Sequence, residues 1–285
     1  MDSEFYLTSN NNDKTLPLTE EQFKELKRAR KRLSLVHAVS HKYRLVLSNY
    51  RIIDQHMAQL GELYASQYNV EDIEKLKPQL NASINNYVLS ARIFTSQLKR
   101  HIQSCLPTER ERVTELSELM DRLYQRSFAY RFVDAMYDYV TYYGLSFHAF
   151  HCQSSIVLDE DGQPQRRFNF KAYIEREYIG GPADFRASVL EETPERIDVL
   201  QLLAEFNTCL GELHASAMKM VQTVLNDAEN MVREFVNVFI GQFGAQHANI
   251  FVVHKTRAFG DKVYERFPLS MYLDNRLLTG TGDDD

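Results

Sequence analysis

The chain has 285 residues, of which 44% are hydrophobic and 25% are charged, so it can bury a core and is not generally disordered. The formal net charge of −6 excludes a surface that is basic throughout, as in a protein that coats nucleic acid, but it leaves room for a local basic face. The three cysteines, Cys105, Cys152 and Cys209, lie far apart and without CxxC spacing. They fit a reducing compartment and predict neither a disulfide framework nor a zinc site.

Nothing in the sequence predicts contact with a membrane. No apolar run approaches the roughly 18 residues of a spanning helix, and the first residues, Met1–Tyr6, lack the basic-then-apolar pattern of a signal peptide. We expect a soluble, cytoplasmic protein.

The predicted organisation is a flexible N-terminal arm over residues 1–18 and one elongated domain over residues 19–285. The arm contains the polar stretch Ser9–Asp13. The parts that we expect within the domain are a helical bundle (19–153), a β-hairpin insertion (154–185), a long helix (193–244), and a strand with a C-terminal tail (245–285).

A very long first helix is predicted from Thr19 to about Gln67. Thr19 is a candidate N-cap, and Gln22 is its capping-box partner. Apolar residues then recur at alternating steps of 3 and 4, at Val36, Val39, Tyr43, Val46, Tyr50, Ile53, Met57, Leu60 and Tyr64. This is a heptad a/d pattern, and such a helix needs partner helices because it is not stable alone in water.

The first helix also carries a block of basic residues. Between Lys24 and Arg51 nine basic residues stand against one acid, Glu25, a local balance of +8. The block is either a solvated face that acidic helices neutralise, or a contact surface for nucleic acid or an acidic partner. The candidate contact residues are Lys24, Lys27, Arg28, Arg30, Lys31, Arg32, Lys42 and Arg44.

Two further helices are predicted to pack antiparallel to the first. A short piece, Val70–Lys77, should end at Pro78. A second helix follows, with heptad spacing from Leu80 to Ile102 and an end near Leu106-Pro107. A capping box at Thr108 and Glu111 should open a third helix that continues to Gly144. Short connections between long periodic helices predict an antiparallel bundle.

The helical period then gives way to strands. Ser154–Leu158 and Arg167–Ile174 should form a hairpin around the turn signal Asp161-Gly162. The last long helix should begin with Thr193 as N-cap and Pro194 at its first position. The strand Asn249–His254 should join the hairpin, because two strands alone are marginal.

The segment from Tyr124 to Tyr143 is rich in tyrosine, with arginine and aspartate interleaved. A buried tyrosine needs a partner for its hydroxyl group. The segment therefore predicts either rings packed in the bundle with bonded hydroxyls, or a pocket or partner surface. The residues of that second hypothesis are Arg131, Asp134, Tyr137, Asp138, Tyr142 and His148.

A long helix with Tyr130-Arg-Phe, a following hexapeptide and Tyr143-Gly144 resembles the helix of HEPN-type bacterial proteins. In that family an Arg-Asn-x-x-x-His hexapeptide supplies the arginine and histidine of a metal-independent ribonuclease, usually at a dimer interface. In this chain the hexapeptide is Tyr137–Tyr142, and both the arginine and the histidine positions hold tyrosine. The resemblance therefore implies the scaffold of the family without its nuclease, unless a catalytic pair lies elsewhere.

Other chemistry-bearing patterns are weak. Arg32/His37 and Arg51/His56 are five residues apart, about 140° around a helix, so neither pair converges. His148, His151 and Cys152 lie close in sequence, but no carboxylate spacing completes a metal site, and a structural role is favoured. No nucleotide loop or dinucleotide fingerprint occurs, so we expect no cofactor.

The sequence therefore predicts a mainly α protein, an elongated bundle of long antiparallel heptad helices with a small antiparallel β-element. The function we expect is that of a non-enzymatic interaction or scaffold protein, which self-associates through its heptad helices or packs with a partner helix. The alternative is a HEPN-like RNA-targeting toxin or defence ribonuclease. A third hypothesis is a small-molecule sensor that uses the small sheet and the tyrosine-rich pocket.

Overall fold

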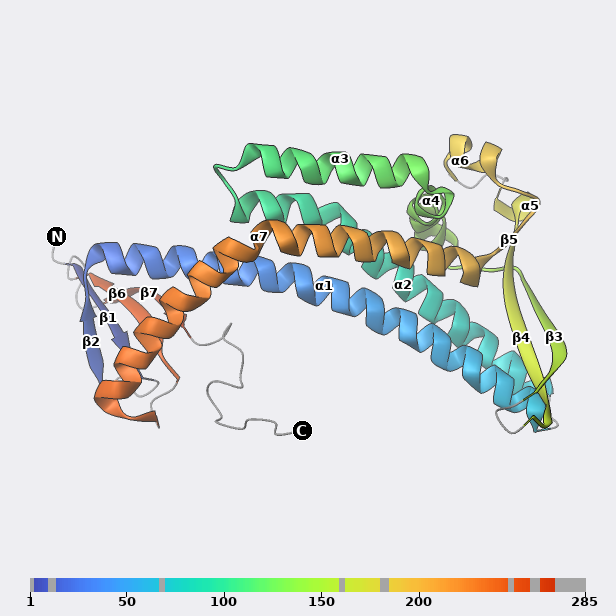
Figure 1. Cartoon of the computed structure of the whole chain (residues 1–285), viewed down its shortest axis with the longest axis horizontal. Helices are drawn as coiled ribbons and strands as arrows, with labels where there is room; N and C mark the ends of the chain where they lie inside the picture. The colour runs from blue at the N-terminus through green and yellow to red at the C-terminus, as the bar shows by residue number, and fades with distance from the viewer. Residues whose placement is uncertain are drawn as a thin grey trace. The chain divides into compact units, whose positions relative to one another are not determined.

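The computed structural model describes residues 3–9, 14–66, 70–158, 162–179, 185–245, 249–256 and 262–269. This part of the chain is mainly helical, with long, antiparallel packed helices and two small antiparallel sheets, which confirms the predicted fold class (Figure 1). The helices are α1 (Glu20–Ala65), α2 (Val70–Cys105), α3 (Arg110–Arg126), α4 (Phe128–Tyr143), α5 (Arg176–Ile179), α6 (Ala187–Glu192) and α7 (Val199–Phe243). The strands are β1 (Ser3–Thr8), β2 (Thr15–Leu18), β3 (Ala149–Leu158), β4 (Pro164–Glu175), β5 (Arg196–Asp198), β6 (Phe251–Thr256) and β7 (Lys262–Pro268).

The chain divides into two compact units. Unit 1 comprises Met1–Ala38, His101–Arg110 and Met218–Asp285, and unit 2 comprises Val39–Arg100 and Glu111–Ala217. Helices α1, α2 and α7 each contribute one part to unit 1 and another to unit 2. Neither unit therefore coincides with any of the four parts that the sequence predicts.

Unit 1 is built on a four-stranded antiparallel sheet with the strand order β2-β1-β6-β7. Its core joins apolar side chains of the sheet to those of α1 and α7. The fully or almost fully buried members of this core are Leu7, Phe23, Leu26, Ala29, Leu33, Ala228, Val232, Val236, Phe239, Ile250, Val252, Phe267 and Leu269. Helix α1 enters this core through the predicted capping box. The Gln22 side chain accepts from the Thr19 N–H (2.9 Å) and the Thr19 hydroxyl accepts from the Gln22 N–H (3.1 Å), which confirms that prediction.

The prediction of a flexible arm over residues 1–18 is wrong for the two strands that this segment contains. β1 pairs with β2 and, on its other side, with β6, so that Ser3 lies opposite Thr256. Leu7 of β1 is completely buried. The polar stretch Ser9–Asp13 favoured the prediction of a flexible arm. The strand that pairs with β1 is β6, about 245 residues farther along the chain, so no local sequence pattern indicates the pairing.

The prediction that the strand near residues 249–254 joins the hairpin is also wrong. This strand is β6, which pairs with β1 and β7. The hairpin β3–β4 instead gains its third strand from β5, which immediately precedes α7, in a sheet of the order β3-β4-β5. The physical expectation that two strands need a third is met, but by a different segment.

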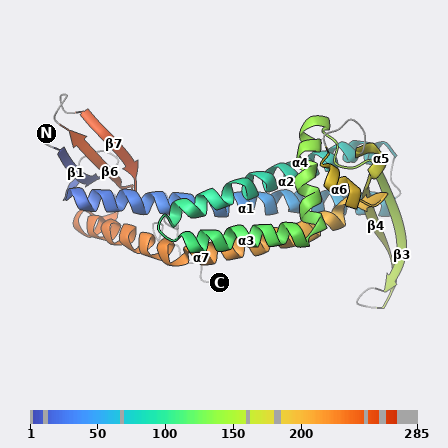
Figure 2. The ribbon, with the colours of Figure 1, turned by 90° about the horizontal axis from the view of Figure 1, so that it is seen from above.

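Unit 2 contains the parts of α1, α2 and α7 that lie within Val39–Arg100 and Glu111–Ala217, packed side by side with α3 (Figures 1 and 2). The heptad positions Val39, Val46, Ile53 and Leu60 of α1 are almost completely buried. On α2 the buried residues include Leu80, Ile84, Tyr87, Phe94 and Leu98. The predicted 3/4 pattern therefore marks the core faces of these two helices.

The predicted helix boundary at Pro78 is wrong. Helix α2 runs through Pro78 without a break, whereas the sequence predicts an end there. Pro78 is exposed, so its ring and its lost hydrogen bond face water, while Leu76 and Leu80 on either side are buried. The packing of the apolar face thus outweighs the local cost of proline.

The single third helix that the sequence predicts is in fact two helices. Ser127 interrupts it and N-caps α4, because its hydroxyl oxygen accepts from the Tyr130 N–H at 3.1 Å. Gly144 ends α4 with φ 71°, as predicted for a C-cap. The break turns the chain, so that α3 and α4 present side chains to one another across the junction.

The start of α7 also lies later than predicted. Asp198 caps this helix, since its carboxylate accepts from the Leu200 N–H at 3.1 Å. Thr193 instead follows α6, and its hydroxyl donates to the Val189 carbonyl at 2.7 Å. Residues 196–198, between the two positions, form β5, a use that the sequence pattern did not indicate.

Candidate functional site

The basic residues of α1 that lie in unit 1 form a stripe on the outer face of the helix. Lys24, Lys27, Arg28 and Lys31 are exposed, whereas Phe23, Leu26, Ala29 and Leu33 between them are buried. Positions three and four apart lie on one face of a helix. We call Lys24, Lys27, Arg28, Lys31 and the half-buried Arg32 the basic stripe.

Carboxylates neutralise part of this stripe. Lys24 pairs with Glu20 at 2.5 Å, and Lys27 pairs with Glu265 of β7 at 2.7 Å. Arg28, Lys31 and Arg32 have no carboxylate at ion-pair distance among the residues that the structure describes. The stripe therefore retains three uncompensated positive charges over about one and a half turns.

The other predicted contact residues have different surroundings. The Arg30 guanidinium lies 4.9 Å from the centre of the Phe267 ring, packed against the sheet of unit 1. Lys42 and Arg44 belong to unit 2. The Lys42 ammonium contacts the Gln97 side-chain oxygen, and burial lowers its pKa, whereas Arg44 is exposed. Six of the eight predicted residues thus lie in unit 1 and two in unit 2.

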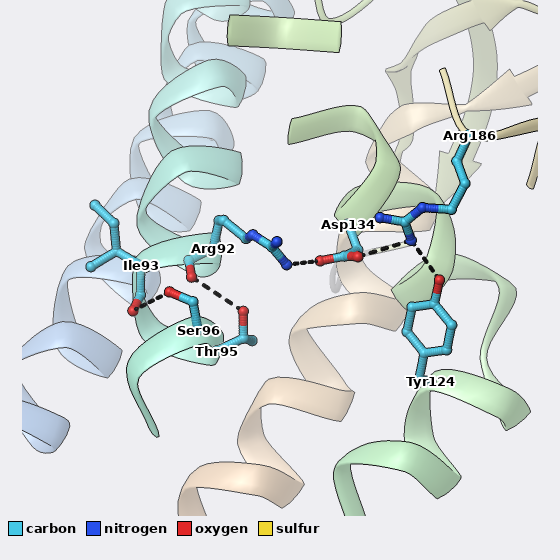
Figure 3. Close-up of polar contacts among 7 residues, drawn as sticks. All are labelled: Arg92, Ile93, Thr95, Ser96, Tyr124, Asp134 and Arg186. Carbon is cyan, nitrogen blue, oxygen red and sulfur yellow. Dashed lines mark hydrogen bonds and ion pairs between the residues drawn. The ribbon is translucent and has the colours of Figure 1, made fainter. Parts of the chain in front are cut away.

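The tyrosine-rich segment contributes to a polar cluster around Asp134 in unit 2 (Figure 3). Asp134 lies on α4, and its two carboxylate oxygens accept from two arginines, Arg92 of α2 and Arg186 just before α6. The Arg186 bond is 3.0 Å long. The same nitrogen of Arg186 donates to the Tyr124 hydroxyl of α3 at 2.5 Å. The cluster therefore connects four segments of the chain.

The electrostatics of the cluster favour a fixed ion pair. Burial by itself lowers the pKa of Arg186, but the hydrogen bond and the negative charge of Asp134 outweigh it and raise that pKa. The Asp134 side chain is only 14% exposed. Because both of its oxygens are engaged by guanidinium groups, Asp134 acts as a clamp between helices and is poorly placed to accept a proton from a substrate.

A small cavity of about 190 Å³ lies beside this cluster. Its lining residues are Arg92, Thr95, Ser96, Met120, Asp121, Tyr124, Tyr130 and Asp134. The Thr95 and Ser96 hydroxyls donate to the carbonyls of Arg92 and Ile93 one turn earlier (Figure 3). The Tyr130 phenol is protonated at neutral pH, and burial raises its pKa further above the ordinary value. The described lining residues thus offer no paired nucleophile and base.

The structure brings some of the predicted pocket residues together and leaves others apart. Arg131 donates to the carbonyls of Tyr124 (2.8 Å) and Gln125 (2.6 Å) and to Glu192 of α6 (2.6 Å), so it locks the α3–α4 junction. The Tyr137 ring lies 5.5 Å from the Arg92 guanidinium. Asp138 and Tyr142 are exposed, and Tyr142 is 78% accessible to solvent.

His148 lies at a separate junction, between α4 and the β3–β4 hairpin. Its Nδ1 accepts from the Glu175 N–H at 3.1 Å, and its Nε2 lies 3.2 Å from the Tyr139 hydroxyl. Burial lowers the pKa of His148, against a smaller opposing effect of Glu175. The neutral imidazole is thus a bridge between three backbone segments.

Arg92 and Arg186 are the members of the Asp134 cluster that the sequence did not indicate. Arg92 falls outside the heptad positions of α2, and Arg186 lies in a linking segment without periodicity. The one available signal was Asp134, a carboxylate on a largely apolar helix that required a positive partner.

The other motifs of the sequence remain isolated. His56 contacts the Ser83 hydroxyl at 3.1 Å, across α1 and α2. Within the described ranges, no group of three or more histidine, cysteine or acidic side chains is arranged to hold a metal ion. Within the same ranges, no helix combines the length and hydrophobicity needed to cross a bilayer.

Comparison with known proteins identifies no relative. The chain matches no family model, and it has no significant match among curated proteins or among solved structures. The resemblance to HEPN-type proteins thus rests on the hexapeptide segment Tyr137–Tyr142 and its flanks alone.

Proposed function

We propose that the protein is a non-enzymatic helical interaction protein that binds the phosphate backbone of a nucleic acid through the basic stripe of α1. The observation that carries the proposal is the uncompensated charge of Arg28, Lys31 and Arg32 in a protein with a net charge of −6. Cations that were needed only for solubility would not have to gather within one short stretch of a helix.

The geometry of the stripe suits a polyanion. Arg28 and Lys31 are one turn apart on a helix whose opposite face is anchored in the core of unit 1 by Leu26 and Ala29. A rigid row of cations matches a row of phosphates, and each contact releases a counterion into solution. The affinity gained in this way does not depend on base sequence.

The Asp134 cluster supports the non-enzymatic part of the proposal. Its carboxylate is held by two arginines, and the neighbouring Tyr130 is a protonated phenol whose pKa burial raises further. These groups connect helices. They lack the paired acid and base that hydrolysis of a phosphodiester requires.

The test is fluorescence anisotropy of a labelled single-stranded RNA with the full chain across a salt series. The double variant Arg28→Glu/Lys31→Glu should bind at least about tenfold more weakly at low salt than the unmodified chain. The slope of log affinity against log salt should fall by about 1.4, because each phosphate contact on a single strand contributes about 0.7.

The matched control reverses two exposed cations elsewhere on the long helices, Arg51→Glu/Lys219→Glu, which changes the net charge equally. Equal losses in both double variants, or no binding by the unmodified chain at low salt, would exclude the stripe as a phosphate surface. A protein partner would then be the next candidate for the stripe.

The same RNA, examined on a gel, tests the HEPN-like alternative. Cleavage that needs no metal and disappears in His56→Ala or His148→Ala would replace the proposal with a ribonuclease. Intact RNA after binding agrees with a non-enzymatic role.

A further inference from the structure

Strand β3 leaves a long backbone edge unpaired. It forms one side of the three-stranded sheet β3-β4-β5 and pairs only with β4 among the residues that the structure describes. It lies on the outer side of β4 in both views of the molecule (Figures 1 and 2). The strand is 10 residues long, so its outer edge presents a row of backbone N–H and C=O groups.

The edge also lacks the features by which proteins prevent strand addition. Ala149–Leu158 contains no charged residue and no proline, and its register with β4 is continuous over the whole length. The edge strands of the other sheet differ. β2 is short and contains Pro17. The pairing of β7 with β6 has a register shift between His254 and Lys255 of β6, and β7 carries Glu265 and Arg266. The chain thus protects one sheet and leaves β3 open.

One face of β3 carries Phe150, Cys152, Ser154, Ile156 and Leu158, so it is apolar except at Ser154. Phe150 stacks on Phe170 with 5.6 Å between ring centres, and Phe170 contacts Tyr64 of α1 at 5.0 Å. At the far end of the same face, beyond Cys152 and Ser154, Ile156 and Leu158 are 74% and 71% exposed. Burying exposed isoleucine and leucine side chains against a neighbouring strand removes apolar surface from water and so stabilises the pairing.

We propose that β3 is a self-association edge at which two copies of this chain pair their β3 strands antiparallel about a two-fold axis. The strand is neutral, so its pairing with itself brings no like charges together. A two-fold axis through Ser154 pairs every residue from Phe150 to Leu158. It places Phe150 opposite Leu158 of the second copy, and Cys152 opposite Ile156.

This register puts the apolar residues of the two copies on one side of the joined sheet, on both sides of the Ser154 pair. Residues directly opposite each other in an antiparallel pair point to the same side of the sheet. The two three-stranded sheets would therefore become one six-stranded sheet in which Ile156 and Leu158 are covered from both copies. An isologous contact of this kind closes at the dimer and does not propagate into a fibre. The inference does not depend on the proposed nucleic-acid function, because β3 and the basic stripe lie in different units.

The first experiment measures the monomer–dimer equilibrium of the full chain by sedimentation velocity over a range of concentrations. The variant Ile156→Lys should weaken dimerisation by at least about tenfold, since it puts a charge on the paired edge. Leu45→Lys makes the same change at an exposed apolar position of α1 (47% exposed) and should leave the equilibrium unchanged.

The second experiment tests the register by cross-linking under mild oxidation, in a Cys152→Ser background. Directly opposed residues have Cα atoms about 4.5–5.5 Å apart, within disulfide range. Ser154→Cys should therefore form a covalent dimer several-fold faster than Ser155→Cys, whose counterpart would be Gln153. Circular dichroism establishes that both variants fold.

Each outcome decides the inference. A monomer at all concentrations, or a dimer that responds equally to Ile156→Lys and Leu45→Lys, would overturn pairing through β3. Faster cross-linking through Ser155→Cys than through Ser154→Cys would overturn the register centred on Ser154. A concentration-dependent dimer that is lost only in Ile156→Lys, with selective cross-linking at Ser154→Cys, is the expected result.

Discussion

At the scale of single residues, charge pairing decides what the tyrosine-rich segment does. Asp134 holds two arginines from other elements, and Arg131 holds two carbonyls of the helix that precedes its own. The sequence indicated Asp134 and Arg131 because they are interleaved with tyrosines whose hydroxyl groups need partners when buried. It could not indicate Arg92 or Arg186, since their partner is known only once the helices are packed.

The first prediction concerns the clamp at Asp134. Asp134→Asn should lower the free energy of unfolding by about 1–2 kcal/mol, because two guanidinium groups lose their counterion. The value lies below that of a fully buried pair, since the Arg92 and Arg186 side chains are 41% and 36% exposed. Urea unfolding followed by circular dichroism measures the change.

Asp138→Asn is the control for this prediction. Asp138 lies one turn farther along α4 and is exposed. Its substitution should change the free energy of unfolding by less than about 0.5 kcal/mol. Equal effects at the two positions would mean that the cluster does not stabilise the helix packing.

The second prediction is a pH dependence through His148. Its pKa is lowered in the folded state, so the unfolded chain takes up a proton first as the pH falls below its ordinary value of about 6.5. The stability that His148 contributes is thus fully present above this value and is lost as the pH falls toward the lowered folded-state pKa. His148→Gln should therefore lose less stability between pH 7.5 and 5.5 than the unmodified chain, measured by urea unfolding at each pH.

His151→Gln serves as the comparison, because His151 is an exposed histidine of the adjoining strand β3. It should keep the pH dependence of the unmodified chain. His214 retains part of that dependence in both variants, since burial lowers its pKa as well. An unchanged pH profile in His148→Gln would show that the imidazole is not held neutral by the junction.

At the scale of the elements, the heptad spacing correctly predicted the long helices and their buried faces, whereas capping and proline patterns misplaced two helix boundaries. Of the heptad positions of α1, Val36, Val39, Val46, Ile53 and Leu60 are buried and the others up to Leu60 are half-buried, because the pattern repeats along one helix face. A boundary depends on a few residues, and tertiary packing overrode it at Pro78 and Thr193. Strand partners were the least predictable, since β1 depends on β6 at the far end of the chain.

The third prediction tests the boundary at Pro78. Pro78→Ala should raise the free energy of unfolding by about 1–3 kcal/mol, because the exposed proline lacks the N–H of a helical residue and its ring crowds the preceding turn. Gln79→Ala, at the next exposed position of α2, should change it by only a few tenths of a kcal/mol. Thermal and urea unfolding of both variants provide the comparison. A destabilising Pro78→Ala would favour the helix end that the sequence predicts.

At the scale of the whole molecule, the two units are discontinuous in sequence. Unit 1 draws on three stretches of the chain and unit 2 on two. A fragment made by truncating the chain at any point between Val39 and Ala217 therefore lacks residues of both units. The sequence could not reveal this arrangement, because α1 and α7 continue from one unit into the other with no change in composition at Ala38 or Ala217.

The pairing of β1 with β6 has a consequence for synthesis on the ribosome. β1 and β2 emerge before the long helices, and β6 follows only after α1 through α7 have been made. Until then the β1–β2 hairpin exposes an open edge, and two strands alone are marginal. Among the described strands, β1 therefore has the longest interval between its own synthesis and that of a pairing partner. During this interval its open edge can bind a chaperone or a neighbouring nascent chain.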